Sequence, residues 1–367
     1  MKIVRVTATI IDHPVIEDRV VVSMAGKHQQ SRFVVVMVED RDGRRGFGES
    51  ATTSLWSGES AETAKFLVDR LFAPALVGIE IEHPSEALEL IEPLAWANPF
   101  TKAGLDTALW DLFAKQKEVP AWTLFSKREP VSILPTRVSI GAYPLEKTVQ
   151  LASEFWRSGI RTLKFKVGLP GVDDAARLKA VREILGGAPR FTVDYNGAFL
   201  DADAALRHID TLLPYGVEYV EQPTHRERIS LMAAVRKQSP LPVLADESIF
   251  SKADLEEAIS LEALDMLSLY PGKNGGVTRT LEMAEIAREN GIKCAIGSNL
   301  ETDLGLAASA LIAASLDAFP VAEVSSDFAS SLFYAGSSIT SPLLLQDGAL
   351  RLPGGVGFGV TPIGVCL

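Results

Sequence analysis

The chain contains little cysteine and no long hydrophobic run. Its two cysteines, Cys294 and Cys366, are too few for a disulfide framework, and Cys294 lies in the strand-like run GIKCAIG. No apolar run is long enough to cross a bilayer, and the opening MKIVRVTATIIDHP lacks the pattern of a signal peptide. We therefore expect a cytoplasmic protein without a membrane partner.

Positive charge is also scarce. The formal net charge is −11, whereas a protein that binds nucleic acid or an anionic membrane presents a basic face. With 47% hydrophobic and 23% charged residues, the composition is that of an ordinary globular protein. Its 367 residues have room for one large barrel and a smaller domain.

Residues 1–130 predict an α+β domain. The runs MKIVRVTATII, RFVVVMVEDRDG and RRGFGES predict a three-stranded meander with a turn at Asp42–Gly43. Helical stretches are expected at 60–74, 84–94 and 101–116.

Residues 131–344 alternate β-rich runs with amphipathic helical segments. The runs are 136–140, 162–167, 191–195, 217–221, 242–246, 265–270, 292–297 and 321–325. Eight such runs, spaced by roughly 22 to 30 residues, predict an α/β fold of the (β/α)₈ TIM-barrel type, with an open doubly wound sheet as the alternative. Residues 345–367 are expected to pack back on the first domain, and their GGVGFGV lacks the strand–turn–helix context of a dinucleotide loop.

Three acidic residues, Asp194, Glu221 and Asp246, each end a hydrophobic run, about one βα unit apart. On neighbouring parallel strands their carboxylates would meet at the C-terminal mouth of the barrel. Because three anions at one point repel one another, a divalent cation is implied, and oxygen ligands favour Mg²⁺ over zinc. Each acid alone could instead cap a helix or pair with a surface arginine, but three at successive strand ends indicate a metal site.

Lys164 and Lys166 fall on one side of the second predicted barrel strand, opposite Leu163, Phe165 and Val167. In a barrel whose outer face packs on helices, both lysines point inward. Two neighbouring ammonium groups should depress each other's pKa, which suits one of them to act as a base. The alternative is a strand with two solvated lysines.

These motifs resemble the enolase superfamily, in particular its muconate-lactonizing-enzyme subgroup, over nearly the whole chain. The likeness comprises the KxK of Lys164 and Lys166, the DxN of Asp194 and Asn196, EQP from Glu221, DES from Asp246, and Gly275–Gly276. FGESATT and KAGLDTALWDL in the first domain match as well.

The resemblance implies a ligand set. Asp194, Glu221 and Asp246 would bind Mg²⁺, or Mn²⁺ in its place, while Asn196 and Glu247 would orient these ligands. A proton α to a carboxylate is weakly acidic, so most of the barrier lies in the dianionic intermediate. A metal near the substrate carboxylate stabilises that charge.

The resemblance also implies that Lys166 is the general acid/base and that Lys164 tunes it and holds the substrate carboxylate. The chain departs from the family on the sixth strand, where relatives carry a second lysine five residues before the glycine pair. Tyr270 stands there as a further catalytic candidate. An unperturbed tyrosine is a poor base because its pKa is about 10, but its hydroxyl could donate a hydrogen bond or act as an acid. Lys273 falls in the loop after the strand and is not expected to replace the missing base.

Other site residues are implied at the seventh strand end and in the first domain. Glu301, in GSNLE, would lie near the substrate, or would only favour a helix N-terminus. Residues 15–30 would form a loop that covers the barrel mouth, with Lys27 and His28 facing a distal carboxylate. Trp56 would wall the pocket. Surface or packing roles are the alternatives for these three.

We therefore predict an enzyme that forms an enolate of a small carboxylate, most simply a cycloisomerase that makes a lactone and needs one proton donor. A dehydratase is the second candidate. An N-acylamino-acid racemase or dipeptide epimerase is the third, because it needs a base on each face. An inactive barrel that serves as a binding protein is the non-enzyme alternative. The resemblance also implies a homo-oligomer.

Overall fold

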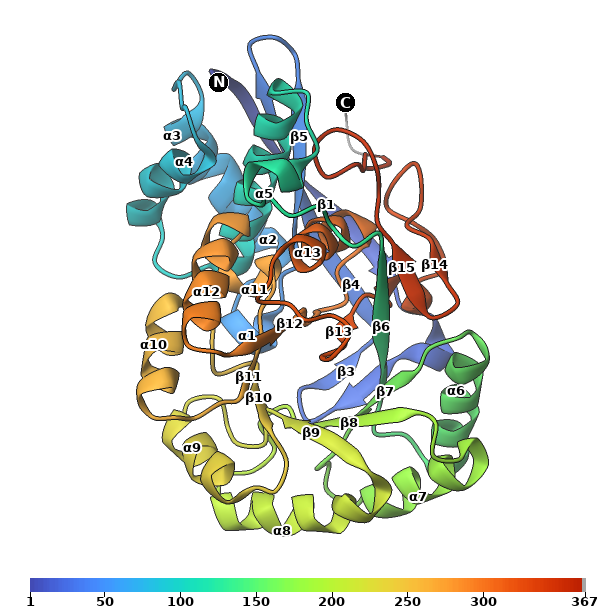
Figure 1. Ribbon diagram of the computed structural model, residues 1–367. Coiled ribbons are helices and arrows are strands. Elements are labelled where there is room, and N and C mark those ends of the chain that lie inside the picture. Colours follow the sequence, from blue (N-terminus) through green and yellow to red (C-terminus); the bar gives the residue numbers. More distant parts are fainter. Residues whose placement is uncertain (365–367) are drawn as a thin grey trace.

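In this computed structural model, residues 1–364 are described; Cys366 and the end of the predicted C-terminal segment lie outside the described residues. The chain forms a cap and a barrel (Figure 1). The antiparallel sheet of the cap has the order β1-β4-β5, formed by β1 (Ile3–Pro14), β4 (Gln30–Asp40) and β5 (Arg45–Ser50). The predicted meander is confirmed, with Gly43 in its turn at φ +79°.

The helices of the cap follow β5 along the chain. They are α1 (Ser54–Ser57), α2 (Ala61–Leu67), the π-helical turn η2 (Val68–Phe72), α3 (Ala73–Leu76), α4 (Pro84–Ile91) and α5 (Pro99–Gln116). The predicted helix at 60–74 is thus three consecutive pieces. Helix α5 packs directly on β5 because Gly46 and Gly48 have no side chain; a Cβ on either would lie 2.1 Å from a carbonyl oxygen of α5. Nearly all of α5 is buried.

Eight parallel strands form the barrel. They are β6 (Ile133–Ile140), β7 (Thr162–Lys166), β8 (Arg190–Asp194), β9 (Val217–Glu221), β10 (Val243–Ala245), β11 (Met266–Ser268), β12 (Lys293–Ala295) and β13 (Ser326–Asp327). They pair in chain order, and β13 pairs with β6. On its other side, the Asp327 amide donates to the Ile296 carbonyl after β12 (2.9 Å), which closes the ring. The predicted barrel is confirmed.

Helices connect the strands on the outside of the barrel. They are α6 (Leu145–Arg157), α7 (Asp174–Leu185), α8 (Ala202–Leu212), α9 (Ile229–Gln238), α10 (Lys252–Ser260), α11 (Pro271–Asn274), α12 (Val277–Glu289) and α13 (Asp303–Ser315). Short 3-10 turns lie at η1 (Glu17–Arg19), η3 (Glu92–Leu94), η4 (Ala121–Leu124), η5 (Leu213–Tyr215) and η6 (Ser330–Phe333).

One strand prediction is wrong. The run VAEVS at 321–325 forms turns, and the eighth strand begins at Ser326. The amides of Glu323 and Val324 donate to the Pro320 carbonyl, so local turn hydrogen bonds take the place of a ladder. The β-rich composition of this run reflects burial of Val324 in the barrel interior.

The C-terminal segment contacts both parts of the molecule. Strands β14 (Leu345–Gln346) and β15 (Ala349–Arg351) form a hairpin that adds to β6 in antiparallel orientation. Further on, the Phe358 amide donates to Asp111 of α5 (3.0 Å). The segment thus lies against the barrel sheet first and against the cap helix afterwards.

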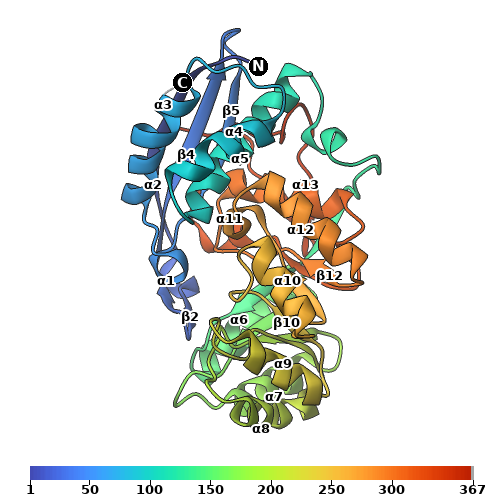
Figure 2. The ribbon, with the colours of Figure 1, turned by 90° about the vertical axis from the view of Figure 1, so that its left-hand side faces the viewer.

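A small hairpin, β2 (Val21–Ser23) and β3 (Gly26–His28), extends from the cap over the barrel mouth. Figure 2 shows it beside α1 at the lower end of the cap. The Ala142 amide, after β6, donates to the Val22 carbonyl of the hairpin (2.7 Å). We call β2 and β3 the hairpin below.

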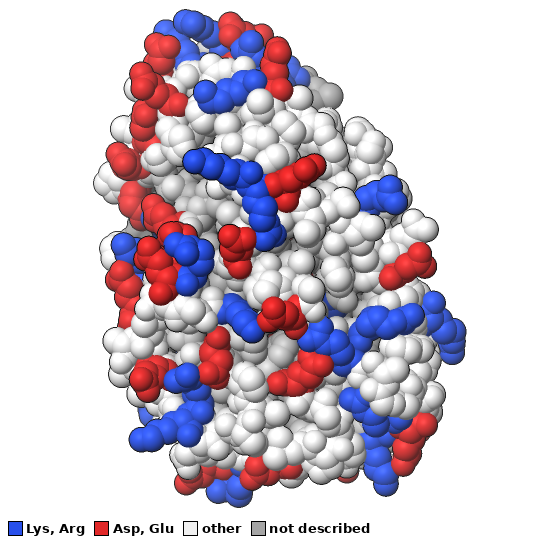
Figure 3. Space-filling view, in the orientation of Figure 1, with Lys and Arg blue, Asp and Glu red and all other residues white. Residues whose placement is uncertain are grey.

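The surface carries mixed charge. On the face in Figure 3, basic and acidic side chains are interspersed over cap and barrel. Among the described residues, no helix is both long enough and apolar enough to cross a membrane.

Candidate active site

The predicted acids lie at adjacent strand ends. In the parallel ladders Lys166 pairs with Asp194, and Asp194 pairs with Glu221. Glu221 pairs with Leu244, two residues before Asp246. All three carboxylates are buried. The barrel therefore brings together at its C-terminal mouth the residues that the sequence placed one βα unit apart.

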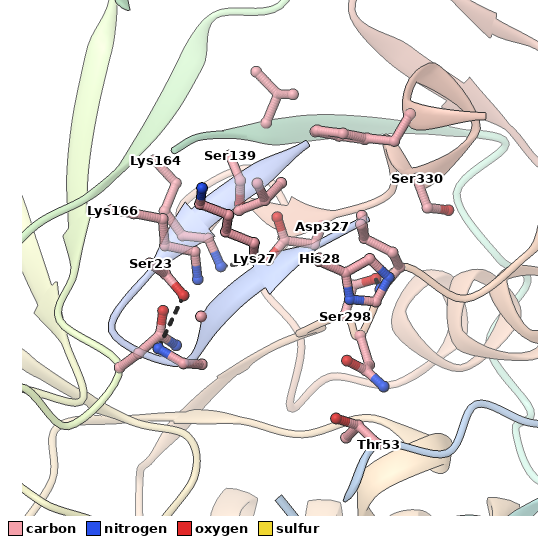
Figure 4. Close-up of a pocket in the computed structure, with 18 of the residues that line it drawn as sticks. Ser23, Lys27, His28, Thr53, Ser139, Lys164, Lys166, Ser298, Asp327 and Ser330 are labelled. Carbon is pink, nitrogen blue, oxygen red and sulfur yellow. Dashed lines mark hydrogen bonds and ion pairs between the residues drawn. The ribbon is translucent and has the colours of Figure 1, made fainter. Parts of the chain in front are cut away.

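Both lysines of β7 point into the barrel. Lys166 Nζ lies 2.5 Å from Asp194 Oδ2. Lys164 Nζ lies 3.3 Å from Glu221 Oε1 and 2.9 Å from Asp327 Oδ2. Figure 4 shows the two amines side by side at the pocket. The alternative of two solvated lysines is wrong for Lys164, which is 4% exposed.

The expected effect of the lysine pair on acidity is also wrong for Lys164. Burial and the charge of Arg137 both oppose its ammonium form, but Asp327, Glu221 and Asp194 outweigh them and raise the pKa of Lys164. Lys164 is therefore a fixed positive charge at neutral pH.

Sequence reasoning missed Arg137 and Asp327. Arg137, on β6, is fully buried; its Nε donates to Asp327 (2.9 Å) and its Nη1 donates to the Tyr219 hydroxyl (2.6 Å). Arg137 and Ser139 alternate with Val138 in TRVSI, so the same period of two that identified the lysines could have marked Arg137 as inward-facing. Asp327 lies just beyond the misplaced eighth strand, which hid it.

Lys273 lies in the one-turn helix α11, where a loop was expected, and its side chain is fully buried. Its ammonium donates to Asp246 Oδ1 (2.8 Å) and to the carbonyls of Asp246 (2.7 Å) and Ser268 (2.8 Å). These three acceptors take up all the N–H donors of the side chain and hold it away from the cavity. Its place supports the expectation that Lys273 is no replacement base.

Asn196 and Glu247 contact one another beside the acids. Asn196 Nδ2 donates to Glu247 Oε1 (2.5 Å), and the Asn196 amide donates to Asp194 Oδ1 (2.9 Å). Gln222, the middle residue of EQP, accepts the Asp246 amide (3.0 Å) on its side-chain oxygen. It thereby ties the end of β9 to the end of β10.

The donor set fits a hard divalent cation, although among the described residues no three acidic, histidine or cysteine side chains close around one point. Each acid has an ammonium partner instead. Three buried oxygens have no hydrogen-bond partner within residues 1–364: Glu221 Oε2, Asn196 Oδ1 and Glu247 Oε2. Arg137 Nη2 lies 3.3 Å from the first of them. Burial raises the pKa of Glu221 to about 7. The charge of Arg137 acts against this rise, and the charge of Asp194 adds to it. Unpaired oxygens and crowded carboxylates are what Mg²⁺ would satisfy.

Tyr270 is fully buried, and its hydroxyl has no hydrogen-bond partner among the described residues. Burial, together with the charges of Asp246 and Glu301, raises the pKa of Tyr270 well above its usual value. Tyr270 therefore stays protonated and cannot act as a base at neutral pH.

Glu301 is buried beside Tyr270. It accepts hydrogen bonds from the Ser298 hydroxyl (2.5 Å) and the Asn299 amide (3.1 Å). Helix α13 begins at Asp303 with Thr302 as its cap, so Glu301 precedes the helix and the alternative of an N-terminal helix acid is wrong.

The hairpin, the α1 segment and the barrel ends enclose a cavity of about 120 Å³. Lys27, His28 and Trp56 line it, together with Lys164 and Lys166. The His28 ring is held by the Ser31 hydroxyl (2.7 Å), and burial lowers its pKa to about 4. At neutral pH His28 is thus uncharged and can meet an anion only through a hydrogen bond.

Comparison with known proteins places this geometry in a family. Residues 147–363 match the family described as enolase C-terminal domain-like, and residues 5–126 match the N-terminal domain of mandelate racemase / muconate lactonizing enzyme. Muconate cycloisomerase 1 of Rhodococcus opacus is 31% identical over 369 residues, which cover 98% of this chain and 96% of that protein.

Two solved structures resemble the fold closely. The 2-chloromuconate cycloisomerase of Rhodococcus opacus 1CP superposes with a TM-score of 0.92 at 28% identity, covering 99% of this chain and 97% of that one. The dipeptide epimerase of Enterococcus faecalis V583, complexed with Mg and L-Leu-L-Tyr, gives 0.90 at 26%, covering 98% and 100%. The chain therefore belongs to the enolase superfamily, in the branch of mandelate racemase and muconate-lactonizing enzymes, and is an enzyme with the enolisation chemistry of that superfamily.

Proposed function

We propose that the protein is a Mg²⁺-dependent cycloisomerase that converts an unsaturated dicarboxylate of the muconate type into a lactone. One observation carries the proposal: Lys164 and Lys166 line the cavity, whereas Tyr270 and Lys273 do not. Cycloisomerisation needs one proton donor. Racemisation needs a proton acceptor on each face of the substrate.

Asp194, Glu221 and Asp246 would hold the metal, with Asn196 and Glu247 orienting them. Mg²⁺, or Mn²⁺ in its place, would supply positive charge near the substrate carboxylate, where enolate charge develops. Lys164, kept cationic by its carboxylate neighbours, would hold the same carboxylate.

Lys166 would carry the proton. Its amine lines the cavity and donates to Asp194 Oδ2 (2.5 Å), so it is held where it can give a proton to the substrate. Lys27 would attract the distal carboxylate of the substrate, while His28 would donate a hydrogen bond to it and Trp56 would wall the pocket. The cavity is lined by three lysines and Arg137 against one acid, Asp327, and this excess of positive charge favours a dianion over a substrate with a neutral distal end.

The test is a panel of carboxylic acids incubated with Mg²⁺ in D₂O. We expect lactone formation from an unsaturated dicarboxylate, with deuterium entering the product at one face only. Lys27→Ala should raise KM for the dicarboxylate with little change in kcat. Deuterium at the α-carbon of both enantiomers of an N-acylamino acid or dipeptide would instead show an epimerase, and no exchange in any acid of the panel would overturn the proposal.

Dehydration of a hydroxy acid is the second candidate, favoured by the same one-sided placement of Lys166. In that reaction one residue removes the α-proton and then protonates the leaving hydroxyl. Alkene or keto-acid formation in the same panel, without a lactone, would identify it.

A further inference from the structure

Arg177, on the outside of the barrel, joins two strand ends at the site. It lies in the first turn of α7, which follows β7, and is 2% exposed. Its Nη1 donates to the carbonyl of Lys166 (2.9 Å), and its Nη2 donates to the carbonyl of Gly141 after β6. Nε donates to the Thr148 hydroxyl (3.1 Å) on α6, so one guanidinium holds three elements together.

The first of these contacts fixes the backbone of the proposed proton carrier. Arg177 also donates to Asp174 Oδ1 (2.7 Å), and Asp174 Oδ2 accepts the amide of Gly168 (2.7 Å). The chain is therefore held at Lys166 and again two residues later. Since the side-chain direction at a strand end follows its backbone, this pair sets where the Lys166 amine lies.

The second contact fixes the surface on which the hairpin docks. The residue after Gly141, Ala142, donates its amide to Val22 of the hairpin, and the Tyr143 hydroxyl donates to the Val20 carbonyl (2.8 Å). A Cβ at Gly141 would lie 2.8 Å from the Val22 nitrogen, so hairpin and strand end are in close contact.

We propose that Arg177, with Asp174, is a positioning residue that sets the place of the Lys166 amine and of the substrate-covering hairpin together. This rests on the proposed function in so far as Lys166 carries the proton. A buried ion pair is weak support for stability alone, because well-packed apolar side chains often replace one at no cost. Two carbonyls and a carboxylate that lie in different directions, however, require the several fixed donors of a planar guanidinium.

Arg182, on the same helix, is a matched control. Its guanidinium also donates to backbone carbonyls, those of Tyr215 (2.8 Å), Pro189 (2.7 Å) and Gly186 (3.3 Å). Pro189 and Tyr215 precede β8 and β9, so Arg182 acts at the strand ends opposite to the site.

The experiment compares full-length Arg177→Lys, Arg177→Met and Arg182→Met, with Mg²⁺ present. Amide hydrogen exchange of residues 20–28, thermal unfolding and steady-state kinetics are measured on each. We expect both Arg177 variants to exchange the hairpin amides on the order of tenfold faster. Their kcat should fall by about 10- to 100-fold, as a misplaced catalytic group does. Arg182→Met should lower Tm alone.

Arg177→Lys decides the matter if Arg177→Met does not fold, because lysine keeps the charge opposite Asp174 but cannot reach both carbonyls. Unchanged hairpin exchange and kcat in folded Arg177→Lys would overturn the proposal, as would equal changes in Arg182→Met. If wild-type protein turns over no carboxylate, the proposed function fails, while hairpin exchange still tests the coupling between Arg177 and the hairpin.

Discussion

The two sides of the barrel mouth carry similar charged groups in different surroundings. On the β6–β7 side, Arg137, Lys164 and Lys166 line the cavity. On the β11–β12 side, Tyr270, Lys273 and Glu301 are buried outside it, and the residues that line it there are uncharged: Ser298, Asn299 and Leu300. The difference teaches that proton transfer in this protein should occur at one face of the substrate only. Relatives with a second lysine on the sixth strand have a proton acceptor on each face.

The largest effect should come from a change on the β6–β7 side, whose charged residues line the cavity. Lys166→Ala should reduce kcat by about 10³- to 10⁴-fold, because it removes the only proposed proton carrier. Mg²⁺ affinity, followed by isothermal titration, should change little. Lys179→Ala, an exposed lysine on α7, is the control. Appreciable turnover in Lys166→Ala would mean that protons also reach the substrate from the other side.

Asp246 lies between the two sides, and Asp246→Asn should lower Mg²⁺ affinity by more than about 100-fold, since loss of an orienting partner alone costs 10- to 100-fold. It also removes the anion opposite the buried Lys273 ammonium. Asp265→Asn, whose carboxylate pairs with Arg236 and lies beyond the other end of β10, should leave metal binding unchanged. Unaltered affinity in Asp246→Asn would remove it from the ligand set.

Glu49, which contacts Thr302 after β12, tests whether water reaches the β11–β12 side of the site. Its carboxylate accepts a hydrogen bond from the Thr302 amide (2.9 Å). Burial raises the pKa of Glu49 to about 8, although the hydrogen bonds from Thr302 act in the opposite direction. The folded state thus prefers the protonated acid, so stability should fall as pH rises from 4.5 to about 8.

Glu49→Gln cannot ionise and should gain a few degrees in Tm relative to wild type across that window, as measured by thermal unfolding at several pH values. Glu89→Gln, an exposed glutamate on α4, should show no such gain. A constant difference between Glu49→Gln and wild type at all pH values would mean that water reaches this side.

Tyr270→Phe should have the smallest effect. Its buried hydroxyl has no partner in the part of the chain that the structure describes, so its removal should leave kcat within about twofold and stability unchanged or about 1 kcal/mol higher. Tyr219→Phe should be destabilising, because it leaves the buried Nη1 of Arg137 without an acceptor. A large loss of kcat in Tyr270→Phe would mean that the β11–β12 side also takes part in proton transfer. The contrast between the two sides of the barrel mouth would then be wrong.

Much of the fold could be predicted because burial imposes a period on the sequence. The alternation in LKFK and the apolar runs before Asp194 and Glu221 mark barrel strands directly. The eighth strand was misplaced because it has only two residues, Ser326 and Asp327, and no apolar run of its own. Lys273 could not be placed from sequence, since a four-residue helix after Pro271 leaves no periodic signal.

The sequence by itself determined the order of the strands, the inward face of β7, and the acidic residues at three successive strand ends, because these follow from local periodicity and the chemistry of single residues. Only the tertiary structure decided the partners. Arg137 meets Asp327 across 190 residues because the barrel closes between β13 and β6. The low dielectric inside that closed ring then decides which groups stay charged. It cannot be predicted from any single segment, because it exists only once the barrel has formed.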